Sequence, residues 1–240
     1  MTLTSELTKN LELAAKAILE ADVLLIGAGA GMGVDSGLPD FRGKEGFWNA
    51  YPMFKGRGLS FTDCANPKWF LRNPEQAWGF YGHRFNLYSD TTPHKGFDIL
   101  KRWCSSDLIS DYFIYTSNVD GHFQKAGFSD SRVVECHGSI NYLQCSVCCT
   151  NDIWPAHDLD LSVDEEKLIA TSELPGCPDC GVVARPNILM FDDYHWKGDR
   201  SHEQEDLFNQ WMKGLGNKSL VVIEVGAGIA IPTVRYVCEA

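Results

Sequence analysis

The chain has 240 residues, of which 44% are hydrophobic and 22% are charged, and its formal net charge is −11 at pH 7. This composition is ordinary for a soluble globular protein, and the length fits one domain, or one domain with an inserted lobe. A net negative charge repels a phosphate backbone and no basic patch offsets it, so we expect no nucleic-acid partner. The same charge weakly favours a basic peptide.

The sequence shows no membrane or secretion signal. The apolar run from Leu220 to Val225 contains Glu224 and is far too short to span a bilayer. The N-terminus mixes Glu, Lys and apolar residues, without the basic start and small-residue cleavage site of a secretory signal. The nine cysteines are an odd number, and clustered cysteines in a cytosolic chain usually bind metal or carry chemistry. We therefore predict a cytoplasmic protein with no membrane partner.

The first 26 residues predict a helix and then a buried strand. Between residues 4 and 20 the apolar side chains recur on one helical face. Ala21 to Ile26 is a largely apolar run, which is typical of a strand inside a parallel sheet. Similar runs at Leu108–Tyr115 and Leu220–Val225 each end at a polar or glycine-rich turn. The pattern predicts an α/β fold with a doubly wound, Rossmann-like parallel sheet that binds ligands at the carboxyl ends of its strands.

Two segments between these runs differ in composition. Residues 47–88 are rich in aromatic side chains, which we interpret as core packing, and a helix is expected to open at Asn73-Pro74. Residues 141–184 contain paired cysteines and the acidic stretch Asp158–Glu166. We assign both segments to a smaller lobe, helical at 47–88 and a zinc-ribbon module at 141–184. The Rossmann-like lobe is then formed by residues 1–46, 89–140 and 185–240 of a single catalytic domain.

A glycine-rich loop follows the first predicted strand, at residues 27–33. Small residues let the backbone approach a pyrophosphate, and the next helix offers unpaired N–H groups to it, although a plain strand-to-helix turn has the same composition. A second turn, at residues 116–120, places Asn118 and Asp120 two residues apart after a strand. Both side chains can point into one pocket, where they suit a carboxamide and a ribose; an Asx-type turn is the alternative.

His137 is the candidate general base, because histidine titrates near neutrality and can accept a proton from a ribose hydroxyl. The cysteine pairs Cys145-x-x-Cys148 and Cys177-x-x-Cys180 predict a closed, tetrahedral, structural zinc site. Cys149 is an alternative ligand to Cys148, although the two-residue gap favours Cys148. Two disulfides or free thiols are the other interpretation of these pairs.

Together and in this order, the motifs resemble those of the sirtuins, enzymes that use NAD to remove acyl groups from lysine. Gly29-Ala30-Gly31 aligns with the family's Gly-Ala-Gly, and Ser36 to Arg42 aligns with its Ser-Gly-Ile-Pro-x-Phe-Arg without a gap. Glu135 to Ser139 matches the family's Glu-x-His-Gly-Ser, which implies catalysis by His137 with Asn118 and Asp120 orienting the nicotinamide. The resemblance implies cofactor binding by Gly29, Ala30, Gly31, Asp40, Phe41, Arg42, Ser117, Asn118, Asp120, Gly226, Ala227 and Gly228.

The chain departs from the sirtuin pattern at several positions. Arg185 to Asp193 resembles the segment on which an acyl-lysine peptide lies as an added strand, but Asp192-Asp193 replaces the family's Gly-Glu, which changes backbone freedom there. Ser117 and Phe123 stand where the family has Gln and His. In the turn at residues 226–228, two hydroxyl contacts to the cofactor would be absent.

The resemblance implies an NAD-dependent protein lysine deacylase (deacetylase) with NAD and Zn²⁺ as cofactors and an acyl-lysine protein or peptide as partner. The acyl group passes to ADP-ribose and nicotinamide is released. Two alternatives stay open. Ser117, Phe123 and the Asp192-Asp193 pair favour protein ADP-ribosyl transfer or NAD hydrolysis. Gly33, Gly228 and the short C-terminus favour a catalytically silent module that binds NAD or ADP-ribose.

Overall fold

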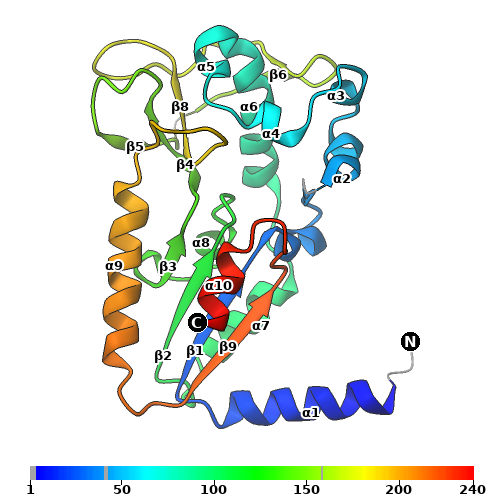
Figure 1. Cartoon of the computed structure of the whole chain (residues 1–240), viewed down its shortest axis with the longest axis vertical. Helices are drawn as coiled ribbons and strands as arrows, with labels where there is room; N and C mark the ends of the chain where they lie inside the picture. Colours follow the sequence, from blue (N-terminus) through cyan, green and yellow to red (C-terminus); the bar gives the residue numbers. More distant parts are fainter. Residues whose placement is uncertain (1–3, 41–42, 158) are drawn as a thin grey trace.

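A four-stranded parallel sheet forms the larger lobe in the computed structural model, which describes residues 4–40, 43–157 and 159–240 (Figure 1). The strands lie in the order β3-β2-β1-β9, and every neighbouring pair is parallel. Their bounds are Val23–Ala28 for β1, Asp111–Thr116 for β2, Val133–Glu135 for β3 and Leu220–Val225 for β9. The predicted Rossmann-like α/β fold is confirmed.

Two of the three predicted strands begin later than the apolar pattern suggested. β1 starts at Val23 and continues through Gly27 and Ala28, because both neighbours pair with it over those residues. All six residues of β1 are buried, as expected for a central strand covered on both faces. β2 likewise ends at Thr116, so the first residue of the predicted polar turn belongs to the strand.

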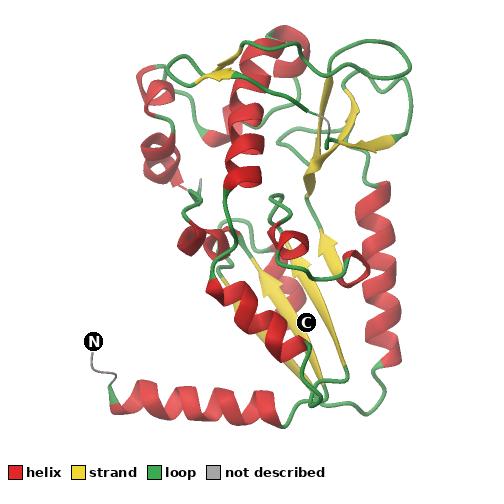
Figure 2. Ribbon diagram, turned by 180° about the vertical axis from the view of Figure 1, so that it is seen from behind, coloured by secondary structure: helices red, strands yellow, loops and turns green. Residues whose placement is uncertain are grey.

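Helices cover both faces of the sheet, as Figures 1 and 2 show from opposite sides. On one face, α7 packs Phe97 and Leu100 against β1 and β2. On the other, α9 and α10 contribute Phe208 and Val234 to a second core. The helices of this lobe are α1 (Ser5–Leu19), α7 (Lys95–Cys104), α8 (His122–Lys125), α9 (Asp199–Gly214) and α10 (Thr233–Glu239), with 3₁₀ helices η1 (Ala30–Ser36) and η2 (Asp130–Arg132). The first of them, α1, forms where it was predicted but extends away from the sheet, and none of its residues is buried.

The second lobe is built around an aromatic core. Its helices are α2 (Gly43–Ala50), α3 (Pro52–Gly56), α4 (Phe61–Cys64), α5 (Trp69–Arg72) and α6 (Pro74–Asp90). Its strands are β4 (Gly138–Cys145), β5 (Ile153–Pro155) and β8 (Ala184–Ile188) in one antiparallel sheet, with β6 (Val163–Asp164) and β7 (Ile169–Ala170) forming a hairpin. Phe47, Phe80 and Tyr81 are among the core side chains, so the aromatic residues of 47–88 pack as predicted. Across the described part of the chain, no helix has both the length and the apolar character needed to cross a bilayer.

A buried ion pair fixes the segment that follows β8. Arg185 donates to both carboxylate oxygens of Asp193, at 2.7 and 2.9 Å, and both side chains are almost fully enclosed. Asp192 has a φ of +56°, the left-handed conformation that glycine adopts most readily and that aspartate tolerates better than most residues. The replacement of Gly-Glu by Asp192-Asp193 therefore retains the turn, and removal of either partner of the pair would cost about 3–5 kcal/mol.

Candidate active site

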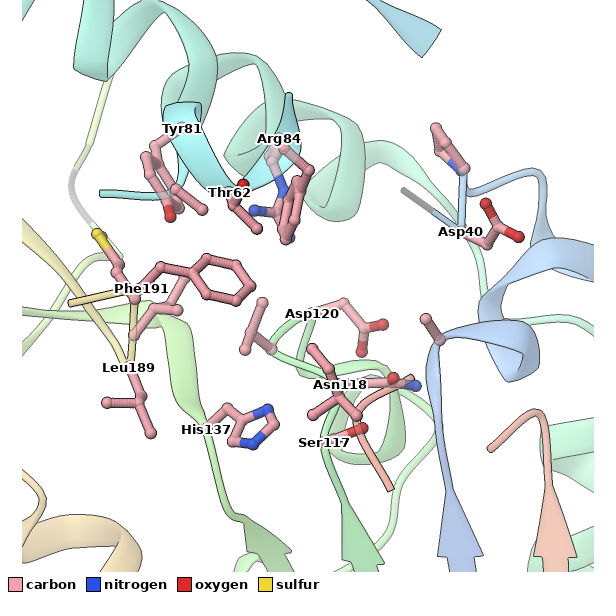
Figure 3. A pocket seen from close by; sticks show the side chains of 18 of the residues that line it. Asp40, Thr62, Tyr81, Arg84, Ser117, Asn118, Asp120, His137, Leu189 and Phe191 are labelled. Carbon is pink, nitrogen blue, oxygen red and sulfur yellow. The ribbon is translucent and has the colours of Figure 1, made fainter. Parts of the chain in front are cut away.

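A cavity of about 820 Å³ opens where the two lobes meet, at the carboxyl ends of β1 and β2 (Figure 3). This volume suits a cofactor together with part of a substrate. One side is formed by residues that follow the parallel strands: Ala30, Gly33, Asp40, Ser117, Asn118, Val119, Asp120 and His137. The other side is formed by α4, α6 and the segment after β8, with Phe61, Thr62, Tyr81, Arg84, Tyr88, Leu189, Met190, Phe191 and Asp192.

The turn after β2 holds its polar side chains by hydrogen bonds to the neighbouring strand. Thr116 Oγ1 donates to the Ala28 carbonyl at 2.9 Å and accepts from the Asn118 N–H at 3.0 Å. The Asn118 side-chain amide donates to the Gly29 carbonyl at 3.1 Å, and one Asp120 oxygen accepts from the His122 N–H at 2.9 Å. Asn118 and Asp120 line the cavity together, as their spacing predicted, and Ser117 lies beside them.

The glycine loop is shaped by its packing against a second loop. The Gly31 N–H donates to the Gly226 carbonyl at 3.0 Å, and a Cβ added to Gly29 would lie only 2.6 Å from that same oxygen. Gly226 itself has a φ of +60°. Among the described residues that line the cavity, this region contributes Ala30, Gly33 and Asp40, while Gly29, Gly31 and residues 226–228 do not. The glycines thus permit the loop after β1 and the loop after β9 to pass close to each other. Two further residues predicted to bind the cofactor, Phe41 and Arg42, lie outside the described residues.

His137 lies in the wall between β3 and β4, facing the cavity below Asp120 (Figure 3). Its carbonyl accepts from the Leu189 N–H at 2.9 Å, and the preceding Cys136 N–H donates to the Thr116 carbonyl at 3.0 Å. The following Gly138 has a φ of +77°, and a Cβ there would overlap the Asn187 carbonyl. The chain is therefore held on both sides of the histidine.

Helix α9 binds the end of β3 immediately before His137. Arg200 Nη2 contacts Glu135 Oε2 at 2.5 Å, Ser201 Oγ donates to the Glu135 carbonyl at 2.9 Å, and the Glu135 N–H donates to Gln204 Oε1 at 3.0 Å. Burial raises the pKa of Glu135, and the charge of Arg200 opposes that rise. No sequence motif marks these helix residues, because they lie more than 60 positions from Glu135 in the chain.

A buried arginine forms the part of the cavity opposite His137. Arg84 is 5% exposed, and its Nε and Nη2 donate to the Tyr88 hydroxyl at 3.0 and 2.8 Å. The guanidinium also lies 5.4–5.7 Å from the ring centroids of Phe61, Phe80, Tyr81 and Tyr88. Burial raises the pKa of Tyr88, so its hydroxyl stays protonated beside the cation. No motif marks Arg84, and it is one of several charged residues within the aromatic-rich segment 47–88.

The cysteines that cluster in the structure differ from the predicted zinc ligands at one position. The thiols that gather within 4.8 Å of one another belong to Cys145, Cys149, Cys177 and Cys180. Cys148, which the two-residue spacing favoured, has a φ of +57°, and its thiol contacts the His195 carbonyl at 3.6 Å. The left-handed turn at Cys148 directs that side chain away and brings Cys149 to the cluster.

The four thiols fit a zinc ion. The sulfurs of Cys145 and Cys180 are 3.7 Å apart, and those of Cys149 and Cys177 are 3.5 Å apart. A tetrahedron with Zn–S bonds of about 2.3 Å has edges of roughly 3.8 Å. Although desolvation raises it, backbone hydrogen bonds from Cys149 and Val147 lower the pKa of Cys145 to about 7, which favours the thiolate that zinc binds. The cluster joins the end of β4 to the segment before β8 and can hold this sheet together.

Replacing Asp120 with asparagine is expected to raise the melting temperature, by an amount that grows with pH. Desolvation in the cavity wall raises the pKa of Asp120, despite the opposing influence of His122. The unfolded carboxyl titrates near about 3.9, so above that value the native state holds more protons and stability falls as pH rises through the native pKa. Asp120→Asn removes this loss, and each 1 kcal/mol relieved is worth about 2–4 °C.

Thermal unfolding of both proteins between pH 4 and pH 8 tests this expectation, because the loss begins near the pKa of the unfolded carboxyl. Asp107→Asn, in an exposed turn, is the matched control and should give no gain. A gain for Asp120→Asn that is equal at pH 4 and pH 8 would contradict the assignment, because it would not come from the titration of the carboxyl.

Comparison with known proteins places this site in a family. The model of the Sir2 family matches residues 29–223. An NAD-dependent protein deacylase of Aeropyrum pernix is 30% identical over 203 residues, which cover 85% of this chain and 69% of the relative. One of Aquifex aeolicus is 33% identical over 166 residues, covering 69% of this chain but only 59% of the relative.

Solved structures share the fold. A Sir2 homologue in complex with NAD superimposes with a TM-score of 0.67 at 23% identity, covering 95% of this chain and 78% of that one. Sir2Tm bound to a propionylated peptide gives a TM-score of 0.62 at 21% identity, covering 94% of this chain and 79% of that one. At these identities the structures support the fold alone, and the family follows from the match over residues 29–223. The chain belongs to the Sir2 family.

Proposed function

We propose that this protein is an NAD-dependent protein lysine deacylase. The observation that carries the proposal is the single cavity shared by Asn118, Asp120 and His137 with the loop residues Ala30 and Gly33. These residue types suit a carboxamide, a ribose and a proton acceptor, and they lie at the strand ends where a Rossmann-like sheet binds its ligands. The curated relatives named NAD-dependent protein deacylases support the same activity.

When bound, NAD supplies nicotinamide as leaving group and ADP-ribose as acyl acceptor. Asn118 and Asp120 hold the carboxamide in one orientation from the turn after β2. His137 accepts the proton of a ribose hydroxyl, because neutral imidazole is a competent base at physiological pH. The acyl oxygen of the modified lysine would first replace nicotinamide on the ribose carbon, which makes the acyl carbon electrophilic. Once the hydroxyl has lost its proton, its oxygen bonds to the acyl carbon and the bond from that carbon to the lysine nitrogen breaks. One water is consumed overall, and the products are free lysine and acyl-ADP-ribose.

The cavity also supports a preference for the acyl group. Arg84 is a buried cation in a wall formed mainly by aromatic and aliphatic side chains, with Ser60, Thr62 and Asp192 as further polar members. A carboxylate at the end of the acyl chain would form a charge-assisted hydrogen bond there, which is stronger than a neutral one. We infer that acyl groups ending in a carboxylate, such as succinyl, are better substrates than acetyl.

The zinc cluster is assigned a structural role, since four cysteine ligands leave no open position for a substrate. The cluster joins the end of β4 to the segment before β8. At the opposite ends of these two paired strands, β4 is preceded by His137 and β8 is followed by residues 189–192, which line the cavity. The reduced thiols that this site needs support a cytoplasmic location, which stays a prediction.

Nicotinamide release from NAD, measured with and without an acyl-lysine peptide, tests the activity. Release that requires the peptide and yields acyl-ADP-ribose, identified by mass, is the expected result. His137→Ala should abolish this product while NAD binding persists. Release without peptide would replace the proposal by NAD hydrolysis or ADP-ribosyl transfer, and binding without any release would replace it by a silent binding module.

A further inference from the structure

We propose that His94 is a positioning residue that braces the cofactor loop η1 and thereby raises the affinity for NAD. This inference rests on the proposed function. His94 precedes α7 and touches η1 at two points 62 and 58 positions away in the sequence. Its Nε2 lies 2.9 Å from the Met32 carbonyl, and its backbone N–H donates to Ser36 Oγ at 3.0 Å.

The hydrogen bonds determine which ring nitrogen carries the proton. The Gly96 N–H donates to His94 Nδ1 at 2.9 Å, so Nδ1 is the acceptor and has no hydrogen. Nε2 therefore carries the hydrogen and donates it to the Met32 carbonyl. The same imidazole thus caps the N-terminus of α7 and holds η1. An edge contact with Phe97, with centroids 5.1 Å apart, fixes the ring further.

Two residues of η1 line the cavity, Ala30 and Gly33, and the two contacts of His94 lie on either side of the second. Gly33 lines the cavity and lies between Met32 and Ser36. The start of the loop is anchored separately, where the Gly31 N–H donates to the Gly226 carbonyl. Without the imidazole, the side of η1 toward α7 would keep the Ser36 hydrogen bond and the apolar packing of Met32 near Phe97, but it would lose the hydrogen bond that fixes the Met32 carbonyl. A loop that is ordered before binding loses less conformational entropy when the ligand arrives, which favours affinity.

The substitution His94→Asn removes the hydrogen bond to the Met32 carbonyl while it keeps the cap of helix α7. Asparagine is a good N-cap and can still accept from the Gly96 N–H, and the backbone contact to Ser36 is independent of the side chain. The shorter side chain does not reach the Met32 carbonyl. We expect the KM for NAD to rise by about three- to tenfold, the value of one hydrogen bond, with kcat within about twofold of the original. His94→Ala removes cap and brace, and should lower the melting temperature as well.

Hydrogen exchange of the amides at Met32–Ser36, in the ligand-free protein, tests the brace without relying on activity. Exchange should accelerate several-fold in His94→Asn, and His202→Asn, the same change at an exposed position of α9, should have no effect. Unchanged exchange in His94→Asn would overturn the brace. Faster exchange with an unchanged KM for NAD would overturn its role in cofactor binding. If the original protein neither binds nor cleaves NAD, the proposed function fails and with it the role in NAD affinity, while exchange still decides whether the brace exists.

Discussion

Replacing Arg84 with methionine is expected to remove the preference for acyl groups that end in a carboxylate. Methionine retains much of the length and packing of arginine but has no charge and no donors. Truncating one partner of a buried, hydrogen-bonded charge pair costs about 2–5 kcal/mol, so kcat/KM for a succinyl-lysine peptide should fall by roughly 30- to 4,000-fold. For the matched acetyl-lysine peptide the expected change is within about tenfold, since an acetyl group does not use the charge.

The comparison of the two peptides separates specificity from a general loss of structure. Arg84 also contacts Tyr88 and the surrounding rings, so melting temperatures must be measured alongside the kinetics. Arg72→Met, at an exposed position of α5, is the matched control and should leave both peptides unaffected. A parallel fall in kcat/KM for both peptides would show that Arg84 supports the fold of the pocket and not the choice of acyl group.

Serine at position 149 is expected to abolish zinc binding, whereas serine at position 148 is expected to leave it intact. The Cys149 thiol belongs to the four-sulfur cluster, while the Cys148 thiol contacts the His195 carbonyl. Structural zinc in small finger peptides contributes about 10–16 kcal/mol of apparent binding free energy at neutral pH, and three ligands recover only part of it. Cys149→Ser should therefore lose its zinc and melt well below the original protein.

Metal content per chain and melting temperature measure the outcome for both variants. The two substitutions are the same chemical change at adjacent positions, so each is the control for the other. We expect about one zinc in the original protein and in Cys148→Ser, and a chelator should lower the melting temperature of both. Zinc retained in Cys149→Ser but lost in Cys148→Ser would restore the two-residue spacing and contradict the geometry of the turn.

Features that depend on neighbouring residues could be predicted from the sequence. The helix at the N-terminus follows from apolar periodicity, and the helix from Pro74 follows from a proline at its first turn. Three of the four strands of the parallel sheet, β1, β2 and β9, follow from apolar runs that end in polar or glycine-rich turns. Asn118 and Asp120 were predicted because polar residues that follow a strand of a parallel sheet lie at its carboxyl edge, whereas Ser117 and His137 were identified through the resemblance of their motifs.

Backbone conformation and contacts between distant residues were decided only by the tertiary structure. The choice between Cys148 and Cys149 depends on a left-handed φ, which the spacing of cysteines does not encode. The glycines at 29, 31 and 226 serve the crossing of two loops more than the cavity wall, because the packing of β1 beside β9 brings those loops together.

The positions of Arg84 and His94 at the site likewise could not be predicted from the sequence. Arg84 becomes part of the cavity because α6 lies across the carboxyl edge of the sheet, and His94 reaches η1 because α7 packs on the same face as Met32. The local sequence therefore determines which elements form and which chemistry their turns carry. The packing of one element on another determines which side chains meet, since those contacts join residues that lie tens of positions apart in the chain.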